Sequence, residues 1–209
     1  VRASGFEGFF YAIQTLKQML PAAIFGTVPT PKAKWELPCC KISDSPRFRY
    51  RATLLDVSRH YFSVEEIKRI IDIMSVYKKN ILHWHLTDDQ GWRIEIRKYP
   101  LLTEIGSRRP YTQTLEGRNT SDGIPHGGFY TRKEVEDIVR YAAERAVTII
   151  PEIDMPGHLI SALTAYPYLG CSGKSIEFGR EYQVRTCWGI AKDVLCVGKE
   201  SSYYFIYDV

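Results

Sequence analysis

Three runs of residues that read as strands, each ending in polar and acidic residues, constrain the fold of this chain most. They cover residues 49–57, 80–86 and 147–154. The third run has a nearly continuous apolar start before it reaches Glu152, which is typical of a parallel strand buried on both faces. We therefore expect three strands whose carboxyl ends carry the polar residues.

Helices are predicted after the first strand and before the third. Ser63 with Glu66, and Thr131 with Glu134, have the spacing of a capping box, in which each side chain accepts the other residue's amide. Apolar residues at helical spacing follow both boxes, and the first helix is expected over 64–77. Strands that alternate with helices imply right-handed crossovers and a parallel sheet.

The regions at the two ends of the chain are less regular. Helical spacing over 6–20 predicts a helix that Pro21 ends, and residues 21–47 predict a proline-rich connecting segment with at most one strand. A last helix is expected from Tyr203, capped by Ser201 and Ser202. Long loops follow all three strands, at the end where α/β barrels place their active sites.

Composition excludes some classes of function. The net charge is +4 and the Lys and Arg residues are scattered, so nucleic acid is not expected as a partner. No apolar stretch approaches the about 20 residues that span a bilayer. The aromatic fraction of 13% suits stacking on sugar rings, and a tyrosine-rich core explains it equally well.

The chain has five cysteines, three of them in one polar region between residues 171 and 196. This grouping favours a disulfide formed in an oxidising compartment, and five reduced thiols is the open alternative. The first residues lack the basic start and apolar core of a signal peptide, so we expect the chain to begin within a longer protein.

Candidate functional residues follow each strand. Arg59 offers a planar fork of donors to hydroxyls or a carboxylate, or forms a salt bridge at the rim. Asp88 and Asp89 should point in opposite directions and have different roles. The Pro156-Gly157 turn can bring His158 back to Asp88 or Asp154, and a carboxylate beside a histidine can support acid–base chemistry.

Two histidines of the second strand, His83 and His85, are in phase on one face. A metal hydrolase would use them with His158 and Asp154 as ligands. The alternative, which we favour, is that both histidines are structural residues of a buried strand.

Three segments resemble the first motif blocks of family 20 glycoside hydrolases, the β-N-acetylhexosaminidases. They read LDVSRHYF at 55–62, HWHLTDDQGWR at 83–93 and PEIDMPGH at 151–158. The resemblance implies a (β/α)8 barrel and a retaining mechanism in which the substrate's own 2-acetamido group attacks the anomeric carbon, without a cofactor. It implies a carbohydrate partner that carries N-acetylhexosamine.

The same resemblance assigns roles by position. Arg59 and Trp92 would bind the substrate. Asp88 and His158 would form a relay to a catalytic glutamate, and Asp154 would brace that relay. Cys171 and Cys196 would be the disulfide partners, and we expect a periplasmic or secreted enzyme.

The catalytic pair of this family, an Asp followed directly by a Glu, does not occur in the chain, whose adjacent acids are residues 65–66, 88–89 and 136–137. A full barrel needs about 250 residues. We therefore expect residues 1–47 to be the tail of an accessory domain with a linker, and 48–209 to be the first part of a barrel, truncated before its fourth strand. Such a fragment should be inactive alone and should self-associate through open sheet edges. A non-catalytic carbohydrate-binding barrel is the alternative function.

Overall fold

A parallel sheet with β2 in its centre organises the structure, a computed structural model that describes residues 1–114 and 120–209. β2 pairs in parallel with β1 on one side and with β6 on the other, and β3 turns back antiparallel to the end of β2. The sheet strands are β1 (Ala52–Asp56), β2 (Ile81–Asp88), β3 (Gly91–Trp92) and β6 (Thr148–Ile153). The three predicted strands and their parallel pairing are confirmed.

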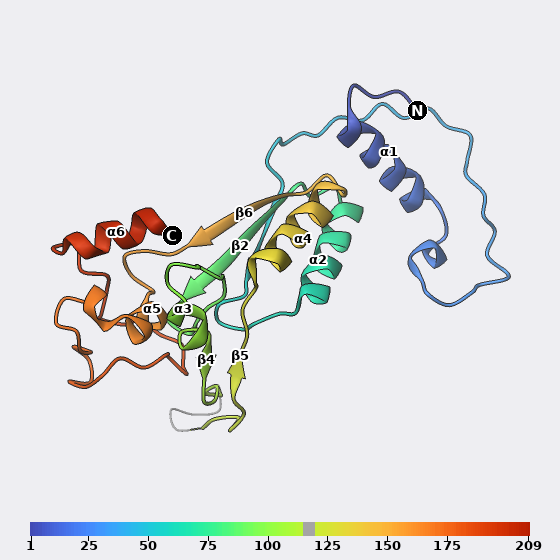
Figure 1. The fold of residues 1–209 in the computed structure, drawn as a ribbon. Helices are drawn as coiled ribbons and strands as arrows, with labels where there is room; N and C mark the ends of the chain where they lie inside the picture. The colour runs from blue at the N-terminus through green and yellow to red at the C-terminus, as the bar shows by residue number, and fades with distance from the viewer. Residues whose placement is uncertain (115–119) are drawn as a thin grey trace.

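Helices α2 (Val64–Val76) and α4 (Arg132–Ala143) lie side by side on one face of this sheet (Figure 1). Both capping boxes form: Ser63 and Thr131 accept the amides of Glu66 and Glu134, whose carboxylates accept the N-cap amides. The apolar stripes of both helices pack on alternate residues of β2, among them Leu82, Trp84 and Leu86. This burial fixes which face of β2 turns toward the helices.

The opposite face of β2 carries His83 and His85. In the parallel register His83 pairs with Leu54 and Ile150, and His85 pairs with Asp56 and Glu152. Leu54 and Ile150 remain 57% and 38% exposed. Apolar residues next to polar ones on an uncovered sheet face are what the inner wall of a partial α/β barrel presents.

The remaining short elements gather at the end toward which the strand arrows point (Figure 1). These elements are α3 (Leu101–Glu104), β4 (Arg108–Arg109), β5 (His126–Gly127), α5 (Ile160–Ala165), the 3-10 helix η2 (Pro167–Leu169) and α6 (Glu200–Asp208). The helices among them form a second core, whose buried residues include Leu163 and Phe205, together with Trp92 of β3. The predicted cap of the last helix was wrong, because α6 begins earlier, after Lys199, with no side-chain cap.

Helix α1 (Phe6–Met19) lies at the opposite end of the sheet from these elements (Figure 1). It ends before Pro21, as predicted, and is followed by the 3-10 helix η1 (Ala22–Phe25). No strand forms in residues 21–47, all of which the structure describes. Among the described helices none is both long and apolar enough to cross a membrane.

Candidate active site

Asp88, the last residue of β2, is the centre of a charged cluster at the carboxyl end of the sheet. Its side chain is completely buried, and both of its carboxylate oxygens have two partners. Oδ2 lies 2.5 Å from Arg59 Nη2 and 3.0 Å from His85 Nε2. Oδ1 accepts the Asp89 amide at 2.7 Å and lies 3.1 Å from His158 Nδ1. The cluster therefore joins the ends of all three parallel strands.

Arg59 reaches Asp88 because of a turn that follows β1. Asp56 Oδ1 accepts the amides of Ser58 and Arg59, both at 3.0 Å, which is the local pattern of an Asx turn. Asp56 Oδ2 also pairs with Arg59 Nη1 at 2.8 Å. Two carboxylates thus orient the guanidinium, which is 26% exposed. The salt bridge expected for Arg59 at the rim is present, and part of its guanidinium group remains exposed to solvent.

His85 is held between two acids, one from its own strand and one from β6. Its Nε2 faces Asp88 and its Nδ1 lies 3.0 Å from Glu152 Oε2. Burial disfavours the charged ring, but the hydrogen bonds with Asp88 and Glu152 outweigh burial and raise the pKa of His85 to about 9. His85 is thus a cation at neutral pH.

The acids respond in the opposite direction. Burial opposes ionisation of Asp88, but the bonds from His85 and the Asp89 amide, with Arg59 and His158 nearby, hold its pKa below the usual range. Burial likewise opposes ionisation of Glu152, and His85 and His83 lower its pKa. His83 Nε2 lies 2.6 Å from Glu152 Oε2 and its side chain is 32% exposed. Both histidines therefore have carboxylate partners on the uncovered sheet face, and only His85 is buried.

His158 comes back over the strand end after the turn that follows β6. It has a left-handed backbone, with φ 53°, which is uncommon for a residue other than glycine and costs free energy. His158 Nδ1 lies 3.1 Å from Asp88 Oδ1 and 3.7 Å from Asp89 Oδ2. The contact with Asp88 predicted from the sequence is present, and Nε2 has no partner among the described residues.

Asp154 joins the cluster more loosely. One carboxylate oxygen lies within 4.8 Å of ligand atoms of His85 and Asp88, and its backbone amide donates to Thr87 Oγ1 at 3.1 Å. Its carboxylate makes no hydrogen bond or ion pair with any residue that the structure describes. The bracing role predicted for Asp154 stays a prediction.

The predicted sugar-binding role of Trp92 was wrong. Its side chain is fully buried in the second core, where its ring packs 6.0 Å from Phe205. The indole N–H donates to the Ile94 carbonyl at 2.7 Å. The ring therefore has no free face for a sugar, because the return strand β3 directs it into the core.

Arg93, within the same motif, is a structural residue that sequence reasoning missed. It is completely buried and donates to the carbonyls of Val57, Ser58, Ser107 and Gly128, which belong to three loops at the strand ends. Burial, with nearby Arg109, lowers its pKa to about 10. The sequence pattern that could have identified this role is an arginine directly after an aromatic residue at the end of a buried strand.

The predicted metal ligands do not come together as one set. In the described part of the chain, the groups that could hold a cation are His85, Asp88 and Asp154, and Asp88, Asp89 and His158. Both groups need Asp88, whose Oδ2 already pairs with the Arg59 cation at 2.5 Å. A guanidinium at that distance repels a metal ion, so the residues present do not fit a metal centre.

Cys171 and Cys196 are free thiols in the structure, as are the other three cysteines. The two side chains nevertheless contact each other, and the hydrogen bond to Cys196 raises the pKa of the Cys171 thiol. Their proximity leaves the predicted disulfide a prediction.

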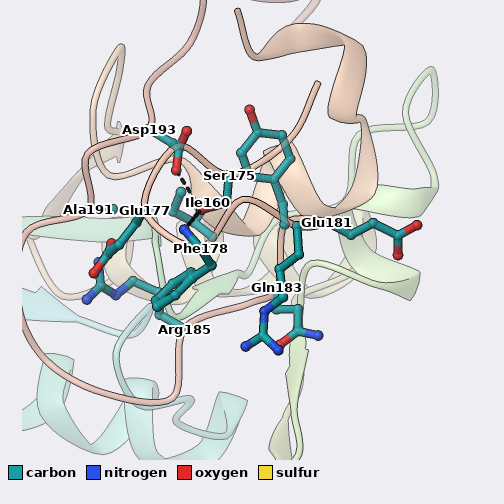
Figure 2. Close-up of a pocket in the computed structure, with 11 residues that line it drawn as sticks. Ile160, Ser175, Glu177, Phe178, Glu181, Gln183, Arg185, Ala191 and Asp193 are labelled. Atoms are coloured by element: carbon teal, nitrogen blue, oxygen red, sulfur yellow. Dashed lines mark hydrogen bonds and ion pairs between the residues drawn. The ribbon is translucent and has the colours of Figure 1, made fainter. Parts of the chain in front are cut away.

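The loop that follows η2, together with Ile160 at the start of α5, lines a small cavity (Figure 2). Its volume is about 40 Å³, and Ser175 donates to Asp193 Oδ2 at 2.9 Å on its wall. Arg185, also on the wall, donates its amide to the Asp89 carbonyl at 3.0 Å. Such a volume holds a few water molecules, whereas ligand pockets measure about 300 Å³ or more. This cavity is therefore too small to hold a sugar ring.

Comparisons with known proteins agree with the geometry. A model for "Glycosyl hydrolase family 20, catalytic domain" matches residues 48–209. A beta-hexosaminidase from Porphyromonas gingivalis is 50% identical over 205 residues, which are 97% of this chain and 24% of that protein. The chain thus spans about a quarter of that relative's length.

Solved structures give the same result. A GH20 beta-N-acetylhexosaminidase from Streptomyces coelicolor A3(2) superposes with a TM-score of 0.82 at 41% identity, over 96% of this chain and 37% of that one. A mutant Streptomyces plicatus beta-hexosaminidase, solved in complex with its product GlcNAc, gives the same TM-score, identity and coverage.

Proposed function

The chain belongs to glycosyl hydrolase family 20, and from this premise we propose that it is part of a longer β-N-acetylhexosaminidase. That enzyme would hydrolyse terminal non-reducing N-acetylhexosamine residues from glycosides by substrate-assisted, retaining catalysis. The observation that carries the proposal is the buried carboxylate of Asp88, which holds Arg59 on one oxygen and His158 on the other. The 41% identity to a solved family member over 96% of the chain supports it.

Each residue of the cluster has a role in this proposal. Arg59, with part of its guanidinium open, would donate to ring hydroxyls of the sugar. Asp88 would hold His158 Nδ1–H, which fixes the ring tautomer and directs Nε2 toward a catalytic carboxylic acid. Asp154 and His85 would keep Asp88 in place. In the 209 residues no Asp is followed directly by a Glu, so we propose that this chain supplies the supporting half of the site.

The division of the chain and its compartment are also proposals. The family model begins at residue 48, which supports an accessory tail and linker before that position and barrel sequence after it. The contact between Cys171 and Cys196 supports an oxidising, periplasmic or extracellular location. Cell fractionation followed by thiol labelling would decide the compartment.

The proposed reaction is tested on the full-length protein with matched aryl glycosides. An aryl N-acetylglucosaminide or N-acetylgalactosaminide should be hydrolysed, because its acetamido group supplies the nucleophile. The matched aryl glucoside, which has a hydroxyl at that carbon, should not be hydrolysed. Comparable rates on both sugars, or no turnover of either acetamido sugar, would contradict the proposal. The 209 residues alone should hydrolyse the aryl glycoside no faster than buffer does, because they lack the Asp–Glu pair.

The uncovered sheet face predicts how the isolated chain behaves. Leu54 and Ile150 are exposed beside the unpaired edges of β1 and β6. We propose that the isolated 209 residues self-associate through these edges. Sedimentation should show dimers or larger species, and a stable monomer would contradict this.

A further inference from the structure

Asp89 is a buried carboxylate beside the cluster to which the proposed mechanism gives no role. Its side chain is completely buried, and Oδ1 accepts the Ile160 amide at 3.1 Å. Oδ2 is also buried, has no hydrogen-bond partner among the described residues, and lies 3.7 Å from His158 Nδ1. A buried carboxylate oxygen without a partner costs free energy. An asparagine would accept the Ile160 amide equally well at lower cost.

We propose that Asp89 is a second positioning carboxylate for His158, which holds the turn of His158 through the Ile160 amide and presents its free oxygen to the imidazole. The inference rests on the proposed function, because it assigns Asp89 to the same relay. Asp88 and Asp89 would then face one ring nitrogen with two carboxylates.

The chain geometry explains how one side chain does both tasks. Ile160 is two residues after His158, so a fixed Ile160 amide restricts where the His158 backbone can lie. Ser161 Oγ donates to the Asp88 carbonyl at 2.7 Å, and the Arg185 amide donates to the Asp89 carbonyl at 3.0 Å. The end of β2 is therefore bonded to the start of α5 and to the loop beyond it. His158, with its left-handed backbone, is held between them.

The charges around Asp89 come from three elements. They are Asp88 at the end of β2, His158 on the turn after β6, and Arg185 on the loop that follows η2. Burial and then Asp88 raise the pKa of Asp89, and the Ile160 amide, His158 and Arg185 oppose this rise. A charged His158 therefore favours a charged Asp89, and the reverse holds by linkage. The pair would stabilise the imidazolium that forms when the relay moves a proton.

The test compares Asp89→Asn with wild type in the full-length protein, by NMR of histidines labelled with ¹³C at Cε1. The His158 signal is identified as the one missing from a His158→Asn variant. The pH at which this signal is half-titrated should fall by about one unit in Asp89→Asn, because an opposite charge within about 4–6 Å has been removed. The alkaline limb of the kcat profile on an aryl N-acetylglucosaminide should move the same way.

Asp193→Asn is the matched control. Asp193 is also a buried acid, and it accepts the Ile176 amide at 2.8 Å as Asp89 accepts the Ile160 amide. This variant should leave the His158 titration where it is in wild type. Asp89→Asn should also melt at or above the wild-type temperature at pH 7, since it removes a buried charge.

The experiment distinguishes a failure of this inference from a failure of the proposed function. An unchanged His158 titration in Asp89→Asn would overturn the inference and reduce Asp89 to an acceptor for one amide. A loss of thermal stability with no shift in the titration would lead to the same conclusion. If wild type hydrolyses no acetamido glycoside, the proposed function fails, and the NMR titration still decides whether Asp89 acts on His158.

Discussion

Replacing Asp88 with Asn tests the charged cluster most directly. The change keeps the size of the side chain and removes the one negative charge that Arg59 and His85 share. Removing one partner of a buried ion pair typically costs about 3–5 kcal/mol. Here Arg59 keeps Asp56 at 2.8 Å and is partly exposed, and His85 keeps Glu152 at 3.0 Å. We therefore expect Asp88→Asn to lower the free energy of unfolding by about 2–3 kcal/mol.

The sign of the pH dependence follows from the lowered pKa of Asp88. A carboxylate with a lowered pKa stabilises the fold above its unfolded pKa, and the contribution is lost as pH falls through the folded pKa. The difference between wild type and Asp88→Asn should thus be largest near pH 7 and should shrink in acid. For a barrel of about 250 residues, the expected loss near neutral pH lowers the melting temperature by about 5–10 °C.

The assay is scanning calorimetry of the full-length protein at several pH values, with kinetics on an aryl N-acetylglucosaminide. Asp72→Asn is the control, because Asp72 pairs with Arg145 on the surface, where an ion pair contributes about 0–1 kcal/mol. Loss of the group that orients His158 should lower kcat/KM by about 10²- to 10⁴-fold. Asp88→Asn with the stability and kinetics of Asp72→Asn would refute the reasoning.

Three further predictions follow from single features of the site. The pKa of His85 is raised to about 9, so its charged ring stabilises the fold fully below its unfolded pKa. This contribution is lost as the pH rises through about 9. The melting temperature of wild type should therefore fall more between about pH 7 and 10 than that of His85→Gln does. Trp92→Ala should cost about 3–5 kcal/mol in calorimetry, whereas Trp92→Phe should leave KM unchanged, and a large rise in KM for Trp92→Phe would restore a sugar-binding role. In a periplasmic or secreted preparation Cys171 and Cys196 should resist maleimide until reductant is added, and rapid labelling of both thiols beforehand would exclude their disulfide.

The sequence predicted the backbone elements that carry the site better than it predicted the contacts of the side chains. Strand ends and capping boxes follow from local patterns that act over a few residues. The return of His158 to Asp88 could be predicted because the two residues follow parallel strands whose carboxyl ends meet at one edge of the sheet. Trp92 was misassigned because its direction depends on β3, a two-residue strand whose pairing with β2 leaves no periodic signal. The role of Arg93 was missed for a similar reason, since its carbonyl partners lie in loops as distant as Gly128. Long-range partners of this kind cannot be read from spacing.

The cluster separates a fixed part from a movable part. Asp88 has both oxygens fully used, and Arg59 and His85 each have a second carboxylate, so none of the three can turn without losing a bond. His158 differs, because it has acids on one ring nitrogen only, is 36% exposed, and depends on the turn that Asp89 holds. A relay needs a rigid acid and a ring that changes its protonation. In the proposed relay, this division of contacts would place the proton movement on His158, with Asp88 as its fixed counter-charge.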